Sequence, residues 1–247
     1  MKRILVPCFL LLVHIVQGAN YRNDGLLEHG IDIYLPDQLT TETQGILMVH
    51  GGGWTAGQKE NMRDQCSDLR DLGYLTATMN YTLHPNWVSK SNAIGDVRDA
   101  YLWLSAQYPS TKIHVLGSSA GGHLAAASVH CLGLRPESLI LLYPPVDLAR
   151  LPSNYHYIWT PEQLIWSPYQ NINSNCGLDT IIYIGTNDNL IPMNIVQDYR
   201  SLSVARGNYC VIKDRPGRAH GFLNDKTKPD YFWFLTHLNG EWLNRYE

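Results

Sequence analysis

The segment Gly117-Ser118-Ser119-Ala120-Gly121 has the residue types and spacing that most directly indicate chemistry. It follows the apolar run Ile113 to Leu116 and precedes an alanine-rich stretch, so a strand must turn sharply into a helix there. Such a turn crowds the chain two positions on either side of its centre, where glycine fits best. Glycines stand at both of these positions around Ser119 and at neither around Ser118. Ser119 is therefore the predicted nucleophile.

A serine hydroxyl becomes a good nucleophile when a base takes its proton and a carboxylate orients that base. For a serine on such a turn, the acid and then the base follow along the chain. His220 lies in a loop between the last apolar run and a final helical stripe, and it is the expected base. Asp188 follows the run Ile181 to Ile184 and is the expected acid, because ligand sites gather at the carboxyl ends of parallel strands. Asp147, after the preceding run, is the alternative acid.

A glycine-rich segment, His50-Gly51-Gly52-Gly53-Trp54, follows another apolar run directly. Consecutive glycines let backbone N–H groups approach a ligand without side chains in the way. Acyl transfer requires such donors, because a negative charge develops on the substrate oxygen in the transition state. We predict that the amides of Gly52, Gly53 and Ala120 form this oxyanion hole.

Predicted strands and helices, which must position these residues, alternate along the chain from about residue 30 onward. Ile31 to Leu35 alternates with period two and stops at Pro36, which predicts an antiparallel edge strand. Continuous apolar runs predict strands covered on both faces at 45–49, 75–79, 113–116, 139–143, 181–184 and 209–212. Apolar spacing, or an alanine-rich composition, predicts helices within 93–108, 120–131 and 231–242. This order predicts an α/β fold with a mostly parallel central sheet flanked by helices.

The first residues have the composition of a secretory signal peptide. Lys2 and Arg3 precede an apolar segment that ends before Gln17-Gly18-Ala19. That segment has about 13 apolar residues, fewer than the roughly 20 that span a bilayer. We therefore expect residues 1–18 to be cleaved and the mature protein to be secreted or periplasmic.

The remaining residues, 19–247, are expected to form one domain. The full chain of 247 residues has a net charge of −3, and without the first 18 residues the charge is −5. An acidic chain is unsuited to nucleic acid or to an anionic membrane as its main partner. No linker or charge block divides the chain, whose length suits a single core.

Four cysteines follow the predicted signal: Cys66, Cys131, Cys176 and Cys210. In an exported protein an even count permits two disulfides, with three connectivities. Four buried thiols are the alternative. The cysteine spacing and the histidine pattern match no zinc motif, so no metal is expected.

Taken together, these motifs resemble the α/β-hydrolase superfamily, and within it the HGGG-type carboxylesterases of the hormone-sensitive-lipase-like and feruloyl-esterase-like branches. The resemblance rests on His50 to Trp54, Asn80-Tyr81, Gly117 to Leu124, Gly185 to Pro192 and His220-Gly221-Phe222. It implies an α/β-hydrolase sandwich, a triad of Ser119, Asp188 and His220, and no cofactor. Trp54 and Tyr81 are then expected to contact the substrate, and His50 is expected to shape the loop.

The chain differs from the larger lipase-like members because it has no long amino-terminal cap. One insertion, about residues 147–179, carries Tyr155, Tyr157, Trp159 and Trp166. These aromatic side chains either form a small lid over the acyl pocket or pack the insertion onto the body. A minimal cap favours short-chain or aromatic acyl groups over long ones.

We therefore expect a serine carboxylesterase that acts on small-molecule esters through an acyl-enzyme. One alternative is an amidase or formamidase resembling kynurenine formamidase, and turnover of N-formylkynurenine against acetyl and feruloyl esters separates the two. The other alternative is a non-catalytic binding protein on a hydrolase scaffold. Labelling of Ser119 by a fluorophosphonate argues against that alternative.

Overall fold

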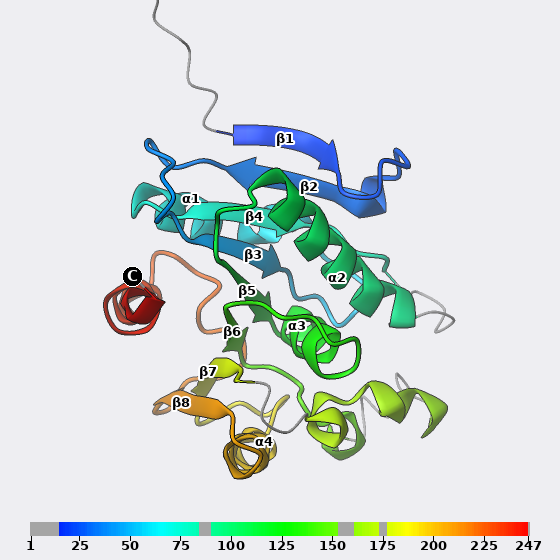
Figure 1. Ribbon diagram of the computed structural model, residues 1–247. Helices are drawn as coiled ribbons and strands as arrows, with labels where there is room; N and C mark the ends of the chain where they lie inside the picture. The colour runs from blue at the N-terminus through cyan, green and yellow to red at the C-terminus, as the bar shows by residue number, and fades with distance from the viewer. Residues whose placement is uncertain (1–14, 84–89, 153–160, 173–176, 247) are drawn as a thin grey trace, which may run out of the picture.

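The computed structural model describes residues 15–83, 90–152, 161–172 and 177–246, and a central eight-stranded sheet runs through them (Figure 1). Its strands are β1 (Ile15–Asn20), β2 (Gly30–Tyr34), β3 (Gly45–Val49), β4 (Leu75–Met79), β5 (Ile113–Ser118), β6 (Ser138–Leu142), β7 (Asp179–Gly185) and β8 (Tyr209–Arg215). They lie side by side in the order β1-β2-β4-β3-β5-β6-β7-β8.

The sheet is antiparallel at its amino-terminal edge and parallel elsewhere. β1 pairs with β2, and β2 with β4, in antiparallel register, whereas every pairing from β4 to β8 is parallel. The central strands β3, β4 and β6 are buried at every residue, as strands covered on both faces should be. The predicted mostly parallel sheet is confirmed.

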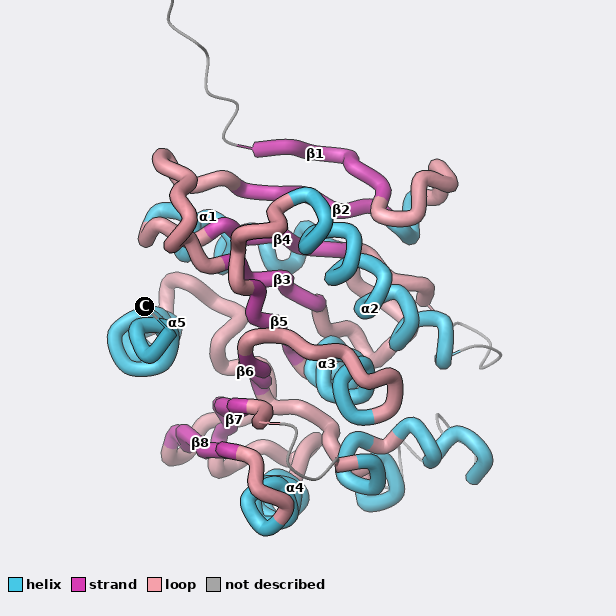
Figure 2. The backbone as a smooth tube through the Cα atoms, viewed as in Figure 1, coloured by secondary structure: helices cyan, strands magenta, loops and turns pink. Residues whose placement is uncertain are grey.

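Five α-helices flank the sheet in the described residues: α1 (Arg63–Asp71), α2 (Lys90–Gln107), α3 (Ala120–His130), α4 (Met193–Ala205) and α5 (Pro229–His237). α5 continues into the π-helical turn η7 (Leu238–Trp242) and the 3₁₀ turn η8 (Leu243–Tyr246). Other 3₁₀ turns are η1 (Leu27–His29), η2 (Lys59–Met62), η3 (Leu148–Arg150), η5 (Pro161–Trp166) and η6 (Pro168–Asn171). Figure 2 shows α2 and α3 on one face of the sheet and α5 on the other.

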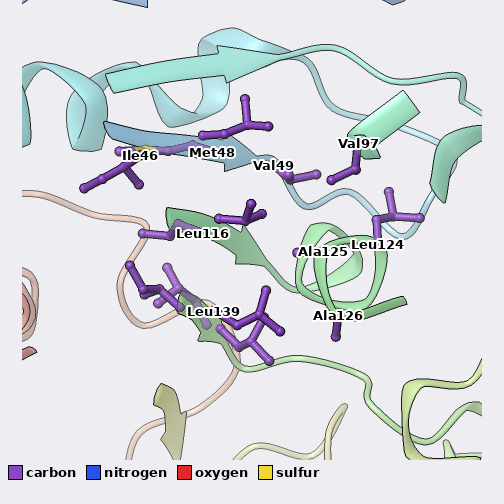
Figure 3. Close-up of a cluster of buried hydrophobic side chains, with 14 of the residues drawn as sticks. Ile46, Met48, Val49, Val97, Leu116, Leu124, Ala125, Ala126 and Leu139 are labelled. Carbon is purple, nitrogen blue, oxygen red and sulfur yellow. The ribbon is translucent and has the colours of Figure 1, made fainter. Parts of the chain in front are cut away.

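The core nearest the predicted nucleophile lies between α3 and the central strands. Figure 3 shows this cluster, which draws on β3, β5, β6, α2 and α3: Ile46, Met48, Val49, Val97, Leu116, Leu124, Ala125, Ala126 and Leu139. Every residue of α3 is buried, since its glycines and alanines let the helix lie close to the sheet. The start of α3 is therefore held firmly against the end of β5.

The amino-terminal edge of the sheet differs from the prediction. The strand at 31–35 is not the edge, because β1 pairs with β2 on its outer side. The Gly18 N–H donates a hydrogen bond of 2.9 Å to Oδ1 of Asp32, so the predicted end of the signal peptide falls inside β1. Residues 16–18 are exposed on that edge, and residues 1–14 lie outside the described residues.

The prediction of two disulfides is wrong. Cys66, Cys131 and Cys210 are free thiols, and Cys176 lies outside the described residues. Two bridges among four cysteines require at least one bridge among these three. The thiol of Cys66 is fully buried and instead contacts Sδ of Met48 at 3.5 Å.

Of the helices that the structure describes, none has the length and apolar character needed to cross a membrane.

Candidate active site

The loops after β3, β5, β6, β7 and β8 meet at one edge of the sheet, because parallel strands bring their carboxyl ends together. A cavity of about 490 Å³ opens at this edge. Residues from the segments after all five strands form its walls: Gly51, Gly52, Gly53, Trp54, Gly57, Asn61, Met62, Ser118, Ser119, Ala120, Tyr143, Pro145, Leu151, Leu190, Ile191, His220 and Asn224.

Ser119 stands at the sharp turn between β5 and α3. Its backbone has φ +52° and ψ −119°, a conformation that a non-glycine residue rarely adopts. A Cβ on Gly117 would lie 2.3 Å from the Gly121 carbonyl oxygen, and one on Gly121 would lie 2.2 Å from that of Val49. Both glycines are therefore required for the turn, as the sequence predicted.

Three predicted side chains meet at the cavity. Oγ of Ser119 lies 2.9 Å from Nε2 of His220, and Nδ1 of His220 lies 2.8 Å from Oδ2 of Asp188. The carboxylate only accepts, so Nδ1 carries the imidazole proton and Nε2 accepts from the serine hydroxyl. This is the tautomer that a general base next to a serine requires.

The carboxylate of Asp188 is held from its other side. Oδ1 accepts the backbone N–H groups of Leu190 at 2.9 Å and Ile191 at 2.8 Å. The side chain is fully buried, so these bonds fix its orientation toward His220. The turn after β7 thus places both the carboxylate and two residues of the cavity wall.

The alternative acid, Asp147, is used elsewhere. Its Oδ1 accepts the backbone N–H of Ala149 at 3.2 Å and so caps η3, and burial raises the pKa of its carboxyl group. Oδ2 lies 3.9 Å from Nη1 of Arg150. The structure places Asp188, and not Asp147, at the imidazole of His220.

Three backbone amides border the cavity beside Ser119. Gly52 and Gly53 have φ of +125° and +59°, and in the described part of the chain their N–H groups donate to no protein acceptor. Ala120 is the first residue of α3, where an amide has no partner within the helix. The structure thus brings together all three residues of the predicted oxyanion hole.

His50 and Tyr81 support the glycine loop from beneath. The His50 Nδ1–H donates to the Gly51 carbonyl at 2.7 Å, and its ring stacks on Tyr81 with centroids 4.3 Å apart. Burial lowers the pKa of His50 to about 4, so the imidazole is neutral. Tyr81 donates its hydroxyl to the His50 carbonyl at 3.1 Å and is 1% exposed. The structure does not place Tyr81 at the cavity, which corrects the expectation of a substrate contact.

Trp54 lies in the cavity wall and is tied to α3. Its indole N–H donates to Nδ1 of His123 at 3.1 Å. The other ring nitrogen of His123 then carries the proton and donates to the carbonyl of Trp166 at 3.1 Å. A buried histidine four residues after the nucleophile thus connects the glycine loop to the insertion. The sequence analysis did not single out His123 for any role.

The part of the 147–179 insertion that the structure describes reaches the cavity through Leu151. Its η6 turn packs against α3, and the Tyr169 N–H donates to the Val146 carbonyl at 2.8 Å. Tyr155, Tyr157 and Trp159, for which a lid and packing onto the body were the two alternatives, lie outside the described residues.

Tyr143 and Asn224 are cavity residues that the sequence analysis missed. Tyr143 follows β6 with φ +39°, and its ring packs against that of His220 with centroids 4.8 Å apart. Its hydroxyl donates to Oδ1 of Asn224 at 2.6 Å and accepts from Oγ of Ser118 at 3.3 Å. The apolar run 139–143 predicts Tyr143 inside a strand, whereas β6 ends at Leu142. No residue pattern in the sequence indicates the positive φ of Tyr143.

Comparison with known proteins agrees with this description. Residues 31–132 match the family model described as BD-FAE. The apo form of Thermogutta terrifontis esterase 2 has a TM-score of 0.76 and 25% identity, over 92% of this chain and 93% of that chain. A truncated carbohydrate esterase from gut microbiota has a TM-score of 0.73 and 21% identity, over 92% and 96%. The chain thus has the fold of these esterase structures, and its site is that of a serine hydrolase.

The curated relatives match over a shorter region. Non-reducing polyketide synthase pkbA from Emericella nidulans is 32% identical over 150 residues, which is 53% of this chain and 6% of that protein. Non-reducing polyketide synthase atr1 from Stereocaulon alpinum is 35% identical over 134 residues, 47% of this chain and 5% of that protein. The chain thus matches a small fraction of the length of these relatives.

Proposed function

We propose that this protein hydrolyses carboxylic esters of small molecules through an acyl-enzyme formed on Ser119. The observation that supports this proposal most is the continuous hydrogen-bonded chain from Ser119 through His220 to the buried carboxylate of Asp188. Ser119, at the end of this hydrogen-bonded series, lies in a cavity bordered by three backbone amides that can donate hydrogen bonds to an oxyanion.

In the first step, Oγ of Ser119 attacks the ester carbonyl while Nε2 of His220 takes its proton. The carbonyl oxygen becomes an oxyanion and is held by the amides of Gly52, Gly53 and Ala120. His220 then gives the proton to the leaving alcohol, and the acyl group stays on the serine. Asp188 stabilises the imidazolium through the 2.8 Å bond to Nδ1.

The acyl-enzyme is hydrolysed by the same groups in reverse. His220 takes a proton from water, the resulting nucleophile attacks the acyl carbonyl, and the proton returns to Ser119 as the acid departs. The amides hold the second oxyanion as they held the first. No further group is required to complete the cycle.

The proposed substrates are esters of short-chain or aromatic acids. The cavity is small, at about 490 Å³, and includes an apolar part formed by Met62, Leu151, Leu190 and Ile191. Two structures of Thermogutta terrifontis esterase 2 with this fold carry bound propionate and butyrate. A cavity of this size is within the range of small-molecule sites, and its apolar part offers a surface for a short or aromatic acyl group.

The decisive variant is Ser119→Ala, with Ser201→Ala as the matched control on the exposed face of α4. We expect Ser119→Ala to lose hydrolysis of p-nitrophenyl acetate and labelling by a fluorophosphonate, whereas Ser201→Ala keeps both. Undiminished hydrolysis by pure Ser119→Ala protein contradicts the proposal. Turnover of N-formylkynurenine above that of all esters tested assigns the site to amide bonds instead.

We also propose that the protein is exported after cleavage near residue 18. The support is the basic pair at Lys2 and Arg3, the apolar segment that follows it and the small residues at Gly18 and Ala19. Cleavage after Gly18 would remove the pairings of Ile15 and Val16 with β2 and the hydrogen bond from Gly18 to Asp32. The residues Ala19 and Asn20, which also pair with β2, would remain. Mass spectrometry of the protein recovered outside the cytoplasm checks the cleavage site, and an intact amino terminus contradicts it.

A further inference from the structure

Asn224 stands at the cavity wall with one end of its amide already fixed. Oδ1 accepts the hydroxyl of Tyr143 at 2.6 Å, and that hydroxyl itself accepts from Ser118. Since the tyrosine hydroxyl donates, the atom facing it must be the amide oxygen, and the orientation of the amide is determined. The amino group, Nδ2, therefore faces away from the buried tyrosine.

Asn224 is exposed to solvent at the cavity wall, and no described residue accepts a hydrogen bond from its amino group. It lies 3.0 Å from the position that a Cβ on Gly221 would occupy. Gly221 has φ +75°, which closes the turn in which the Asn224 N–H donates to the Gly221 carbonyl at 3.0 Å. The turn that carries His220 thus brings the Asn224 amide to the cavity.

The position of this amide relative to the reaction follows from His220. Nε2 of His220 gives its proton to the leaving oxygen, so the alcohol part of the ester lies on the histidine side of the cavity. Asn224 is on that side, because Tyr143 packs its ring on His220 and bonds its hydroxyl to Asn224. Tyr143 is fully buried, so this link is rigid.

We propose that Nδ2 of Asn224 is a hydrogen-bond donor subsite for an oxygen on the leaving alcohol, and that Tyr143 is the positioning residue that orients it. The ligand class is an ester whose alcohol carries an ether or hydroxyl oxygen close to the scissile bond. This inference rests on the proposed esterase function and adds a preference for the alcohol part. A neutral hydrogen bond of this type changes specificity by about three- to tenfold.

The test uses two acetate esters of nearly equal shape, 2-methoxyethyl acetate and n-butyl acetate. They differ by an ether oxygen, which only accepts hydrogen bonds. The measured quantity is the ratio of their kcat/KM values, divided by the ratio of their alkaline hydrolysis rates to remove the difference in intrinsic reactivity. We expect the corrected ratio to be about three to ten for the wild-type protein.

Three variants probe the donor and its orientation. Asn224→Leu removes the amide, and Asn224→Asp replaces the donor by an acceptor at the same position, so both should bring the corrected ratio to about one. Tyr143→Phe keeps the ring on His220 but frees the amide, so it should lower the ratio in part. Asn194→Leu makes the same chemical change on the exposed face of α4, and it should keep the wild-type ratio.

A corrected ratio of one in the wild-type protein, or an unchanged ratio in Asn224→Leu, overturns the subsite. An unchanged ratio in Tyr143→Phe overturns the orienting role of the tyrosine. Fluorophosphonate labelling of Ser119 in each variant verifies that the site has folded. Failure of the esterase proposal is distinguishable, because neither acetate would then be hydrolysed in a Ser119-dependent way.

Discussion

The indole N–H of Trp54 donates to Nδ1 of His123 at 3.1 Å, and this bond joins the glycine loop to the helix that begins beside the nucleophile. His123 is fully buried, and its Nε2–H donates a hydrogen bond to the Trp166 carbonyl. The imidazole of His123, on helix α3, therefore bonds both the glycine loop and the insertion. Trp54 holds a positive φ of +65°, so its side chain anchors a backbone segment that has little freedom.

Replacing His123 by Phe should lower kcat by about tenfold while KM changes less. The loop amides would be less well placed for the oxyanion, and complete loss of one such donor costs about 100- to 1000-fold. His123→Gln retains an acceptor and a donor and should recover part of the loss. Steady-state kinetics with p-nitrophenyl acetate measure both effects. A folded His123→Phe protein with wild-type kcat contradicts the prediction.

Replacing Asp188 by Asn should reduce kcat by about 10³- to 10⁴-fold, because the amide favours the wrong tautomer of His220. Asp147→Asn is the matched control, since that carboxylate caps η3 and does not contact the imidazole. We expect the control to keep activity within a few-fold of the wild type. Equal losses in the two variants would show that Asp188 has no special role.

Stability should fall as the pH is lowered from about 6.5 toward 5. Burial lowers the pKa of His50 to about 4 and that of His114 to about 3, so the unfolded chain binds more protons than the folded chain in this window. Each imidazole then contributes a loss of about 1 kcal/mol per pH unit. Urea unfolding at pH 7 and pH 5 measures the change in the free energy of unfolding, and His114→Gln should make this change smaller. An equal change in this variant excludes His114 as a contributor to the pH dependence of stability.

The thiols of Cys66, Cys131 and Cys210 should be alkylated in denaturant without prior reduction. In the folded protein Cys66 should resist a thiol reagent, because burial raises the pKa of its thiol and excludes solvent. Peptide mass spectrometry reads the labelling of each cysteine. A disulfide-linked pair of peptides from any two of these three cysteines would contradict the structure.

The strands and the residues of the triad were predictable because their signals are local. A continuous apolar run indicates a buried strand, and two glycines around Ser119 indicate the turn. Helices α1 and α4 were missed although each buries one face, through Cys66 and Leu69 in α1 and through Ile195 and Tyr199 in α4. The buried face of α1 has few apolar residues, whereas Ile195, Tyr199 and Leu202 recur at helical spacing in α4, so α4 could have been recognised from the sequence.

The contacts of single side chains were harder to predict than the elements. The family resemblance predicted a substrate contact for Tyr81, yet its ring packs on His50. His123 and Tyr143 act through partners that are 25 to 81 residues away in the chain, which no local pattern reveals. Such pairings arise from the crossing of loops at the sheet edge and require the folded structure.

Three of the four non-glycine residues with positive φ in the described chain, Trp54, Ser119 and Tyr143, lie together around the cavity. Conformations of this type cost of the order of 1–3 kcal/mol each. The reactive edge is thus the part of the molecule that opposes folding most strongly. Ser119→Gly should therefore raise the free energy of unfolding while abolishing turnover, because glycine adopts a positive φ without strain.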